Sequence, residues 1–451
     1  MSEITTNEIV PAVKATQVHK AFGNLHVLKG IDMTVMPGTV TVILGPSGSG
    51  KSTFLRLINQ LETLTGGEID VDGEMIGYKY VDKGGERVLQ TLNDKEVAEQ
   101  RSKLGMVFQR FNLFPHMTAL ENVMEAPVHV KHMDKKEARE LAIQELNRVG
   151  MGERLDYYPA QLSGGQQQRV AIARTLAPKP TVLFMDEPLS NLDAKLRLEM
   201  RYELQRLHVE TGSTFVYVTH DQMEAMTLAT QICLINNGVL QQYDAPLTVY
   251  NRPNNLFVAD FVGNPSINFV EAKGAQRPDG AVDLTVFAGR KATFHPKESL
   301  DLNQWFLDRD ARQAAQEAAH KEKAAQKSYV EKGNKDETFR YHISTVVEYD
   351  DSLREEPVLT NEDLVLGIRP EFLDIVDDSC LEGEIYGAMP TGMESTIKVR
   401  IDDFLLTGVI FGSSLFTIGA KAPLSISGKN IMLFDRKSGQ CIAVGSLEFE
   451  A

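Results

Sequence analysis

The sequence is poor in the residues that build metal centres, disulfide frameworks and membrane spans. It has three cysteines in 451 residues, with no Cys-x-x-Cys or Cys/His spacing, so neither a metal site nor a disulfide framework follows from them and a reducing compartment is favoured. The N-terminal region lacks the apolar core of a secretory signal, and no apolar run approaches the roughly eighteen residues of a membrane span. We therefore expect a chain that is soluble by itself and that needs another subunit to work at a membrane.

Positive charge is also scarce. Lys and Arg number 47 against 62 Asp and Glu, which gives a formal net charge of −15. This balance argues against nucleic acid as a partner, because such binding usually needs a broad basic surface. Hydrophobic content of 42% is ordinary for a globular protein, and the length predicts about two to three domains.

A glycine-rich stretch carries the clearest chemistry. It fits the phosphate-binding pattern Gly-x-x-x-x-Gly-Lys-Ser/Thr and reads Gly45, Pro46, Ser47, Gly48, Ser49, Gly50, Lys51, Ser52, Thr53. An apolar, β-branched run at 39–44 precedes the stretch, and apolar residues at helical spacing follow it. The alternative is a chance glycine-rich turn, which these flanking segments disfavour. Lys51 would reach the terminal phosphates of a nucleotide, and the Ser52 hydroxyl would hold Mg²⁺. The sequence therefore predicts a bound nucleotide.

Other predicted strands end in side chains that suit the same site. Phe22 lies between two strands within 13–35 and could stack on an adenine ring or be an ordinary strand-end residue. Gln109 ends one buried strand and His220 ends another, although a lone strand-end histidine is more often structural than catalytic. These positions predict a polar edge on the sheet.

Two carboxylates end the buried run 181–188. Asp186 would support the metal ion, and Glu187 could accept a proton from an attacking water. A solvated loop start is the alternative, which the five preceding apolar residues disfavour.

A second glycine-rich segment opens a helix further from the loop. It consists of Ser163, Gly164, Gly165 and Gln166, and helix starts of this kind present N–H groups to phosphate. It cannot share the phosphate held by 45–52 unless the two segments are brought together.

The order of elements predicts an α/β domain followed by an all-β domain. Strands alternate with helices to about residue 230, which favours a mostly parallel sheet with an inserted helical subdomain at about 110–176. Residues 265–294 and 364–449 have the pattern of short barrel strands. Residues 296–345 are rich in Ala, Lys, Glu and Gln; we favour a solvated helical insertion there, with a partner-docking arm as the alternative.

Taken together, these motifs resemble those of the ATP-binding subunits of ATP-binding-cassette transporters, over residues 13–262. The matching positions, in the family's order, are Phe22 as the adenine-stacking aromatic, 45–53 as Walker A, Gln109 in the Q-loop, Leu162–Gln166 as the signature, Val182–Asp186 as Walker B, Glu187 as the catalytic glutamate, Ser190–Asp193 as the D-loop and His220 as the switch histidine. The resemblance implies an ATPase that converts ATP and water to ADP and phosphate. It also implies that Ser52 and Gln109 hold Mg²⁺ with Asp186 behind, and that His220 senses the γ-phosphate.

The same resemblance implies a set of partners. Two subunits would dimerise head to tail, so that the signature residues and Asp193 of one close over the ATP of the other. Because the chain has one Walker A and one signature, the second subunit would be another copy or a sister ATPase. Two membrane-spanning permease subunits and, indirectly, an extracytoplasmic solute-binding protein would complete the assembly at the cytoplasmic face of the inner membrane.

The tail looks like that of sugar-type importers. The run 256–263 resembles the exit from the ATPase, and Leu366–Glu371 resembles the hallmark of an oligonucleotide/oligosaccharide-type (TOBE-type) regulatory barrel. We therefore expect an ATP-binding domain over 1–262 and an OB-like barrel with its insertion over 263–451. Segments 74–103 and 108–127 look more like the polar-amino-acid importer branch. We place carbohydrate import first, polar-amino-acid import second, and a soluble cassette ATPase without a transport role third.

Overall fold

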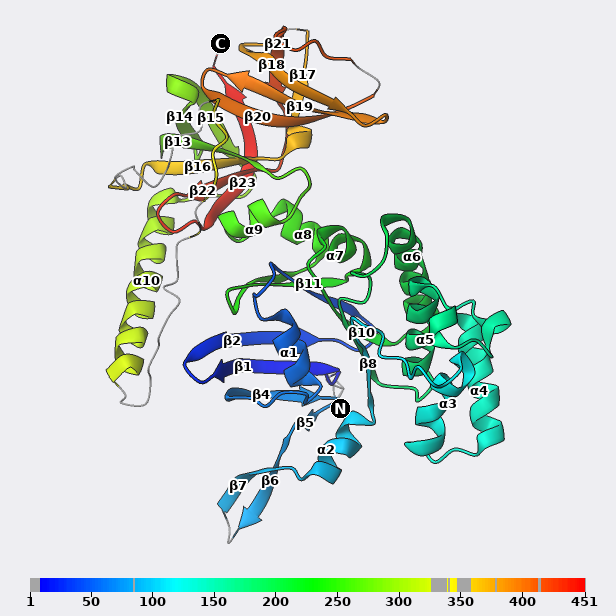
Figure 1. Cartoon of the computed structure of the whole chain (residues 1–451). Coiled ribbons are helices and arrows are strands. Elements are labelled where there is room, and N and C mark those ends of the chain that lie inside the picture. Colours follow the sequence, from blue (N-terminus) through cyan, green and yellow to red (C-terminus); the bar gives the residue numbers. More distant parts are fainter. Residues whose placement is uncertain are drawn as a thin grey trace, which may run out of the picture. The chain divides into compact units, whose positions relative to one another are not determined.

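The computed structural model describes residues 9–83, 86–325, 339, 341–346, 358–377, 379–412 and 415–450. The chain forms two compact units, residues 1–246 and residues 247–451. The first unit mixes helices and strands, and the second consists of strands with a few helices, one of them long (Figure 1).

A six-stranded sheet is the centre of the first unit. Its order is β12-β11-β3-β10-β9-β8, with bounds β3 (Val40–Leu44), β8 (Leu104–Val107), β9 (Val182–Asp186), β10 (Thr214–Thr219), β11 (Gln231–Asn236) and β12 (Val239–Asp244). All neighbours are parallel except β12, which pairs antiparallel with β11. Strands β3, β9 and β10 are buried along their whole length, as expected of continuous apolar runs in a parallel sheet. The predicted α/β fold is confirmed.

Antiparallel strands form the other β structure of this unit. One sheet has the order β2-β1-β4-β5, from β1 (Val13–Phe22), β2 (Leu25–Val35), β4 (Gly66–Val71) and β5 (Glu74–Met75). A two-stranded hairpin, β6 (Tyr78–Lys83) and β7 (Glu86–Thr91), leads to α2 (Asp94–Arg101), which Asn93 caps together with Glu96. The segment 74–103 therefore consists of short strands followed by a helix.

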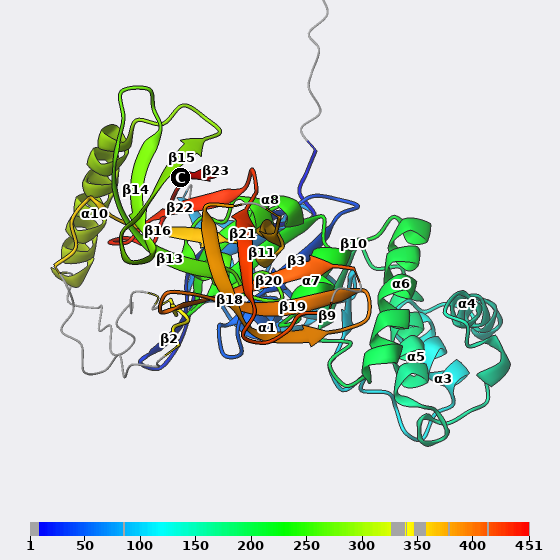
Figure 2. The ribbon, with the colours of Figure 1, turned by 90° about the horizontal axis from the view of Figure 1, so that it is seen from above.

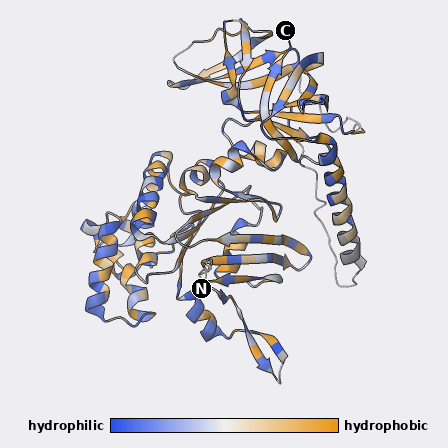
Figure 3. Ribbon diagram, turned by 180° about the vertical axis from the view of Figure 1, so that it is seen from behind, coloured by the Kyte–Doolittle hydropathy of each residue, from blue (hydrophilic) through white to orange (hydrophobic). Residues whose placement is uncertain are grey.

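Helices lie around the sheet in the first unit. Their bounds are α1 (Lys51–Ile58), α3 (Ala119–His129), α4 (Lys135–Arg148), α5 (Gly164–Leu176), α6 (Ala194–Thr211) and α7 (Gln222–Leu228), with short 3₁₀ turns at Gly152–Arg154 and Pro159–Gln161. Helices α3 to α5 fall within the predicted helical subdomain, and their outer faces are largely hydrophilic (Figure 3). Helix α4 buries Ala138, Ala142 and Leu146, which recur at helical spacing.

A closed barrel and a second sheet make up the second unit. The barrel order is β13-β14-β15-β23-β22-β16, with bounds β13 (Asn268–Gln276), β14 (Val282–Val286), β15 (Arg290–Pro296), β16 (Asp363–Ile368), β22 (Ile431–Asp435) and β23 (Cys441–Phe449). The five-stranded sheet β17-β21-β18-β19-β20 consists of β17 (Leu373–Ile375), β18 (Leu381–Pro390), β19 (Glu394–Ile401), β20 (Phe404–Phe411) and β21 (Lys421–Ile426). The predicted β barrel is confirmed, and the structure adds this second sheet.

Two short helices precede the barrel and are tied to it. They are α8 (Pro246–Asn251) and α9 (Leu256–Phe261). Arg369, which is 1% exposed, donates hydrogen bonds to the carbonyl oxygens of Tyr250, Ala259 and Val262. The second compact unit therefore begins before the boundary predicted at 262/263, because a buried arginine that follows β16 binds these helices.

The long helix α10 (Leu302–Ala325) lies within the predicted insertion at 296–345. Its first turns are docked: Leu302 and Phe306 join the barrel core, and Arg309 pairs with Asp435 at 2.9 Å with both side chains at most 2% exposed. Residues 310–318 are exposed. This exposure favours the solvated-helix interpretation, while the docking arm stays a prediction. Residues 326–338 and 340 of the insertion lie outside the described residues.

Replacing Tyr250 by Phe is expected to lower the free energy of unfolding of the second unit by about 1.5 kcal/mol. Its hydroxyl donates to Glu371 Oε1 at 2.7 Å, and hydrogen bonds to charged groups contribute at about this level. Burial raises the pKa of Tyr250 to about 12, so the phenol stays a donor at neutral pH. Urea unfolding followed by the fluorescence of Trp305, the single tryptophan, measures the effect. The control is Tyr386→Phe at an exposed tyrosine, and an equal effect in both variants would contradict the prediction.

Candidate functional site

The predicted phosphate loop lies between β3 and α1, at the carboxyl end of the parallel sheet. Gly45 has a φ of 152°, and a β-carbon there would lie 2.0 Å from the carbonyl oxygen of Ile235 in β11. Only glycine fits so close an approach. Gly48 and Gly50 also have positive φ, at 81° and 99°, which lets backbone N–H groups turn inward. The loop therefore has the geometry of a phosphate cradle.

The Lys51 side chain is held inside this loop. It is 5% exposed, and its Nζ donates to the carbonyl oxygens of Gly45 at 2.9 Å and Pro46 at 2.8 Å. Burial lowers the pKa of Lys51, whereas the carboxylates of Glu187 and Asp186 raise it. The loop thus holds a positive group in place, and such a group attracts phosphate oxygens.

Two motifs far apart in the sequence meet beside the loop. Ser52 Oγ donates to Asp186 Oδ1 at 2.7 Å, and Arg56 Nη2 lies 3.9 Å from the other carboxylate oxygen. They meet because Ser52 lies just after β3 and Asp186 is the last residue of β9, and both strands belong to the same parallel sheet. The hydroxyl oxygen keeps lone pairs for a cation, and Mg²⁺ prefers oxygen ligands, so Ser52 and Asp186 fit a magnesium ion. Over the described residues, no group of three or more His, Cys, Asp or Glu could hold a metal ion.

Gln109, Glu187 and His220 form a second cluster at this edge. Glu187 Oε1 lies 3.3 Å from His220 Nδ1, and Glu187 Oε2 accepts from Gln109 Nε2 at 3.5 Å. The Gln109 amide also donates to Ser190 Oγ at 3.3 Å. Glu187 has a φ of 44°, and its N–H donates to the Val218 carbonyl oxygen at 3.0 Å. A non-glycine residue in this strained region turns the chain sharply after β9, and such strain is typical of functional sites.

Phe22 ends β1 and is 46% exposed. The ammonium of Lys20 lies 4.5 Å from the centre of its ring, and Lys20 is itself fixed by the Thr63 carbonyl oxygen at 2.7 Å and by Glu62 at 3.2 Å. The ring is therefore held in place while much of it faces solvent. Stacking of Phe22 on a base stays a prediction.

The predicted signature segment lies elsewhere in the unit. Ser163 caps α5: its Oγ accepts from Gln166 N at 3.4 Å, and its N–H donates to Gln166 Oε1 at 3.0 Å. A β-carbon at Gly165 would lie 2.6 Å from Leu196 Cδ2, so this glycine lets α5 approach α6. Figures 1 and 2 show α5 grouped with α3, α4 and α6, apart from α1. One chain does not bring Ser163 to Lys51.

The predicted D-loop is joined to the Glu187 cluster at one end. Ser190 Oγ donates to the Glu187 carbonyl oxygen at 2.8 Å, and Asn191 Nδ2 donates to the Gln109 carbonyl oxygen at 2.7 Å. Asp193 at the other end is exposed and caps α6, where it accepts from an N–H of the first turn at 3.0 Å. The loop therefore links the cluster to an exposed helix start.

Sequence reasoning missed two arginines near the site, Arg174 and Arg197. Arg174 donates to the carbonyl oxygens of Phe111 at 2.8 Å and Asn112 at 2.6 Å, and burial lowers its pKa. It joins α5 to the segment that follows Gln109. The partners of Arg174 lie more than sixty positions away in the chain, so no local pattern could have marked it.

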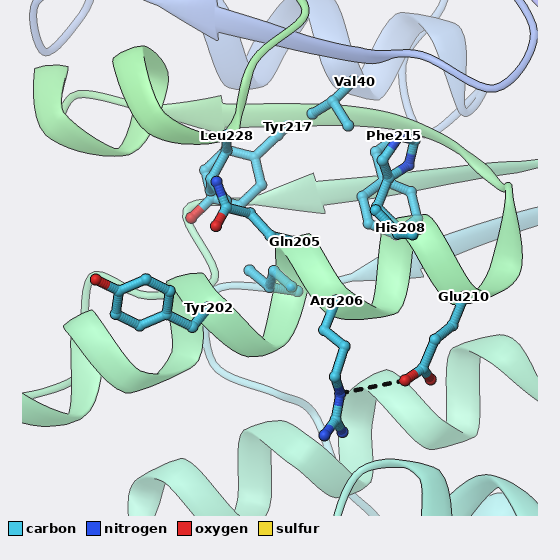
Figure 4. Close-up of a pocket in the computed structure, with 11 residues that line it drawn as sticks. Val40, Tyr202, Gln205, Arg206, His208, Glu210, Phe215, Tyr217 and Leu228 are labelled. Carbon is cyan, nitrogen blue, oxygen red and sulfur yellow. Dashed lines mark ion pairs between the residues drawn. The ribbon is translucent and has the colours of Figure 1, made fainter.

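A groove of about 590 Å³ opens elsewhere in the first unit (Figure 4). Its lining comes mostly from α6, β10 and their neighbours: Val40, Tyr202, Leu204, Gln205, Arg206, His208, Val209, Glu210, Phe215, Tyr217 and Leu228. None of the predicted site residues lines it, so it is separate from the nucleotide site.

Comparison with known proteins gives consistent matches. Residues 28–190 match the family described as ABC transporter. The chain is 46% identical over 252 residues to the arginine transport ATP-binding protein ArgV of Corynebacterium glutamicum, covering 56% of this chain and 97% of ArgV. It is 42% identical over 281 residues to the lactose transport ATP-binding protein LacK of Rhizobium radiobacter, covering 62% of this chain and 72% of LacK. The sulfoquinovosyl glycerol transport ATP-binding protein SmoE of Agrobacterium fabrum is 42% identical over 262 residues, covering 58% of this chain and 68% of SmoE.

A phosphate cradle, a metal-competent Ser–Asp pair and a Glu–His cluster thus share one sheet edge, and relatives match this chain over most of their length. The chain belongs to the ATP-binding-cassette transporter family and is an ATP-binding, ATP-hydrolysing subunit of it.

Proposed function

We propose that this ATPase powers the import of a small polar solute, carbohydrate before polar amino acid, through separate membrane-spanning subunits. The observation that carries the proposal is the convergence of Ser52, Asp186, Glu187 and His220 at the carboxyl edge of one sheet. The arrangement suits hydrolysis, because phosphoryl transfer needs positioning and charge stabilisation more than covalent chemistry.

Each residue then has a role at a stated atom. The loop N–H groups and Lys51 Nζ neutralise phosphate oxygens, and Phe22 stacks on the adenine. The Glu187 carboxylate accepts a proton from the attacking water as that water forms a bond to the γ-phosphorus and the bond to the β-phosphate oxygen breaks. His220, 3.3 Å from Glu187, donates toward the γ-phosphate and holds the carboxylate in position.

Ser52 and Gln109, with Asp186 behind Ser52, would hold Mg²⁺. A magnesium ion held there would supply positive charge against the charge that develops on the phosphate oxygens. Gln109 would contribute its amide oxygen, since its amide nitrogen donates to Glu187 and Ser190.

The site is completed by a second subunit. Ser163 is exposed and caps the start of α5, which lies away from the phosphate loop of its own chain, and Gly164, Gly165 and Gln166 form the first turn of that helix. Asp193 of the D-loop is also exposed. We assign these residues to the ATP held by a partner, which is another copy or a sister ATPase. The head-to-tail arrangement traps two ATP molecules, one at each composite site.

The relatives support carbohydrate as the first candidate solute. LacK and SmoE carry lactose and sulfoquinovosyl glycerol in their names, and each matches beyond half of this chain. The second unit, with its closed barrel, also fits the sugar-type branch predicted from the tail. Polar amino acids are the second candidate, because ArgV is named for arginine and segment 108–127 resembles that branch.

Separate membrane subunits follow from the proposed transport role. No described helix is long and apolar enough to span a bilayer. We assign the chain to the cytoplasmic face of the inner membrane, held there by two permease subunits, with a solute-binding protein reached indirectly. We assign ATP binding to the first unit and regulation to the second, in place of the predicted division into 1–262 and 263–451.

Purification of the tagged chain from detergent-solubilised cells of its source tests this function. Two membrane-spanning proteins and a solute-binding protein are expected to co-purify, and the reconstituted assembly is expected to take up labelled sugar when ATP is enclosed. Uptake of arginine but not sugar would favour the second candidate. An ATPase that co-purifies with no membrane protein would contradict the transport role.

A further inference from the structure

Arg197 lies on the first turn of α6 and bridges two loops that serve different parts of the site. Its Nη2 donates to the carbonyl oxygen of Leu192 at 3.1 Å. Its Nη1 lies 3.5 Å from Asp221 Oδ2, and the two side chains are 31% and 24% exposed. One guanidinium therefore spans the D-loop and the segment that follows β10.

Each of these contacts is one residue from a site residue. Leu192 immediately precedes Asp193, which caps α6. Asp221 immediately follows His220, whose Nδ1 lies 3.3 Å from Glu187 Oε1. A displacement of Arg197 would therefore reach both the exposed D-loop end and the catalytic cluster.

Asp221 is positioned to transmit such a displacement. Its Oδ1 accepts the first N–H groups of α7, from Met223 at 2.8 Å and Glu224 at 3.2 Å. Its own N–H donates to Thr219 Oγ1 at 2.9 Å. The Oδ2 atom faces Arg197. With the other polar groups of Asp221 occupied in the turn, the Arg197 contact joins this turn to the D-loop.

The placement of Arg197 is not optimised for stability alone. Its Nε is buried without a hydrogen-bond partner in the part of the chain that the structure describes. A buried unsatisfied donor costs free energy, so its presence in a folded protein calls for an explanation. The two acceptors in different loops explain it. They fix the orientation of the planar guanidinium, and in that orientation Nε has no partner.

We propose that Arg197 is a positioning residue that couples the D-loop, which serves the partner's ATP, to His220, which serves the chain's own ATP. Closure of the dimer on the exposed D-loop then fixes the position of His220 relative to Glu187. Hydrolysis at one ATP site therefore depends on ATP at the other. The inference rests on the proposed dimeric ATPase and adds a regulatory link between its two sites.

Steady-state ATP turnover of the full chain tests the coupling. Arg197→Met is expected to lower kcat by about tenfold, to change KM for ATP less than about twofold, and to bring the Hill coefficient for ATP below the wild-type value toward one. Arg197→Lys is expected to recover only part of kcat, because an ammonium cannot reproduce the fixed fork of donors. Arg206→Met is the matched control on the same helix and is expected to behave as wild type, since its ion pairs are with Glu203 and Glu210 on the surface of α6.

Two outcomes would overturn the coupling: a wild-type kcat or a wild-type Hill coefficient in Arg197→Met. Thermal unfolding of each variant separates folding from function, and if Arg197→Met does not fold, Arg197→Lys carries the same comparison. Wild-type protein that hydrolysed no ATP would instead contradict the proposed function, so the two failures are distinguishable.

Discussion

A chain carrying Glu187→Gln is expected to bind ATP with wild-type affinity and to turn it over about 10²–10⁴ times more slowly. The amide matches the carboxylate in shape and can still contact His220 and Gln109, which lie 3.3 and 3.5 Å from the Glu187 side chain. It cannot accept the proton of the attacking water. The backbone at Glu187, held at a φ of 44° by the N–H bond to Val218, does not depend on the side chain that is replaced.

Phosphate release at saturating ATP measures turnover, and titration with a fluorescent ATP analogue measures binding. The matched control is Glu199→Gln on the exposed face of α6, for which both quantities are expected to stay at the wild-type level. Equal losses of binding and turnover in Glu187→Gln would mean that Glu187 holds nucleotide rather than activates water.

The meeting of these side chains at one sheet edge could be predicted because local sequence marks the loop and the strands that carry them. The phosphate loop has its own spacing, and Asp186, Glu187 and His220 end apolar runs that could only be buried strands. Parallel strands place their carboxyl ends at one edge, so the Ser52–Asp186 contact across 134 positions follows from the fold class. The same logic places His220 beside Glu187.

The supporting contacts could not be predicted in this way. Arg174, Asn191 and Arg197 bind backbone oxygens or side chains that belong to other loops, and an arginine on a helix is by default a solvated residue. The boundary between the two units was missed for the same reason. It depends on Arg369, which donates to carbonyl oxygens of α8, α9 and the residue after α9, more than a hundred positions earlier in the chain. Such pairings depend on tertiary geometry, and the sequence alone carries no signal for them.

The second sheet of the C-terminal unit shows another limit of the strand pattern. Alternation and turn residues identify β18, β19 and β20 as strands, and burial alternates along β19 and the first half of β18. Nothing in the alternation says which strands close into the barrel and which form the separate sheet, because each pairing depends on partners distant in the chain. Strand identity was therefore available from the sequence, whereas strand partnership was not.

Replacing Ser163 by Arg is expected to leave ATP binding within about twofold of wild type and to lower turnover on the order of 10² or more. Ser163 is exposed at the start of α5, apart from α1 in both views of the ribbon (Figures 1 and 2). A bulky cation there blocks the partner's ATP without touching the Lys51 loop of its own chain. In the Glu187→Gln background, the substitution is also expected to abolish ATP-driven dimers, which size-exclusion chromatography detects.

Loss of the helix cap is the competing explanation for such an effect, and the chain offers a matched control for it. Thr118 caps α3 through the same reciprocal arrangement with Glu121 that Ser163 makes with Gln166. Thr118→Arg should therefore lose a similar capping energy of about 1 kcal/mol, yet keep its turnover and its ATP-driven dimers, since α3 is outside the signature. If Ser163→Arg hydrolysed ATP normally, or if Thr118→Arg failed equally, the site would not be shared between subunits. A selective loss in Ser163→Arg, by contrast, follows only if the partner's ATP meets the start of α5.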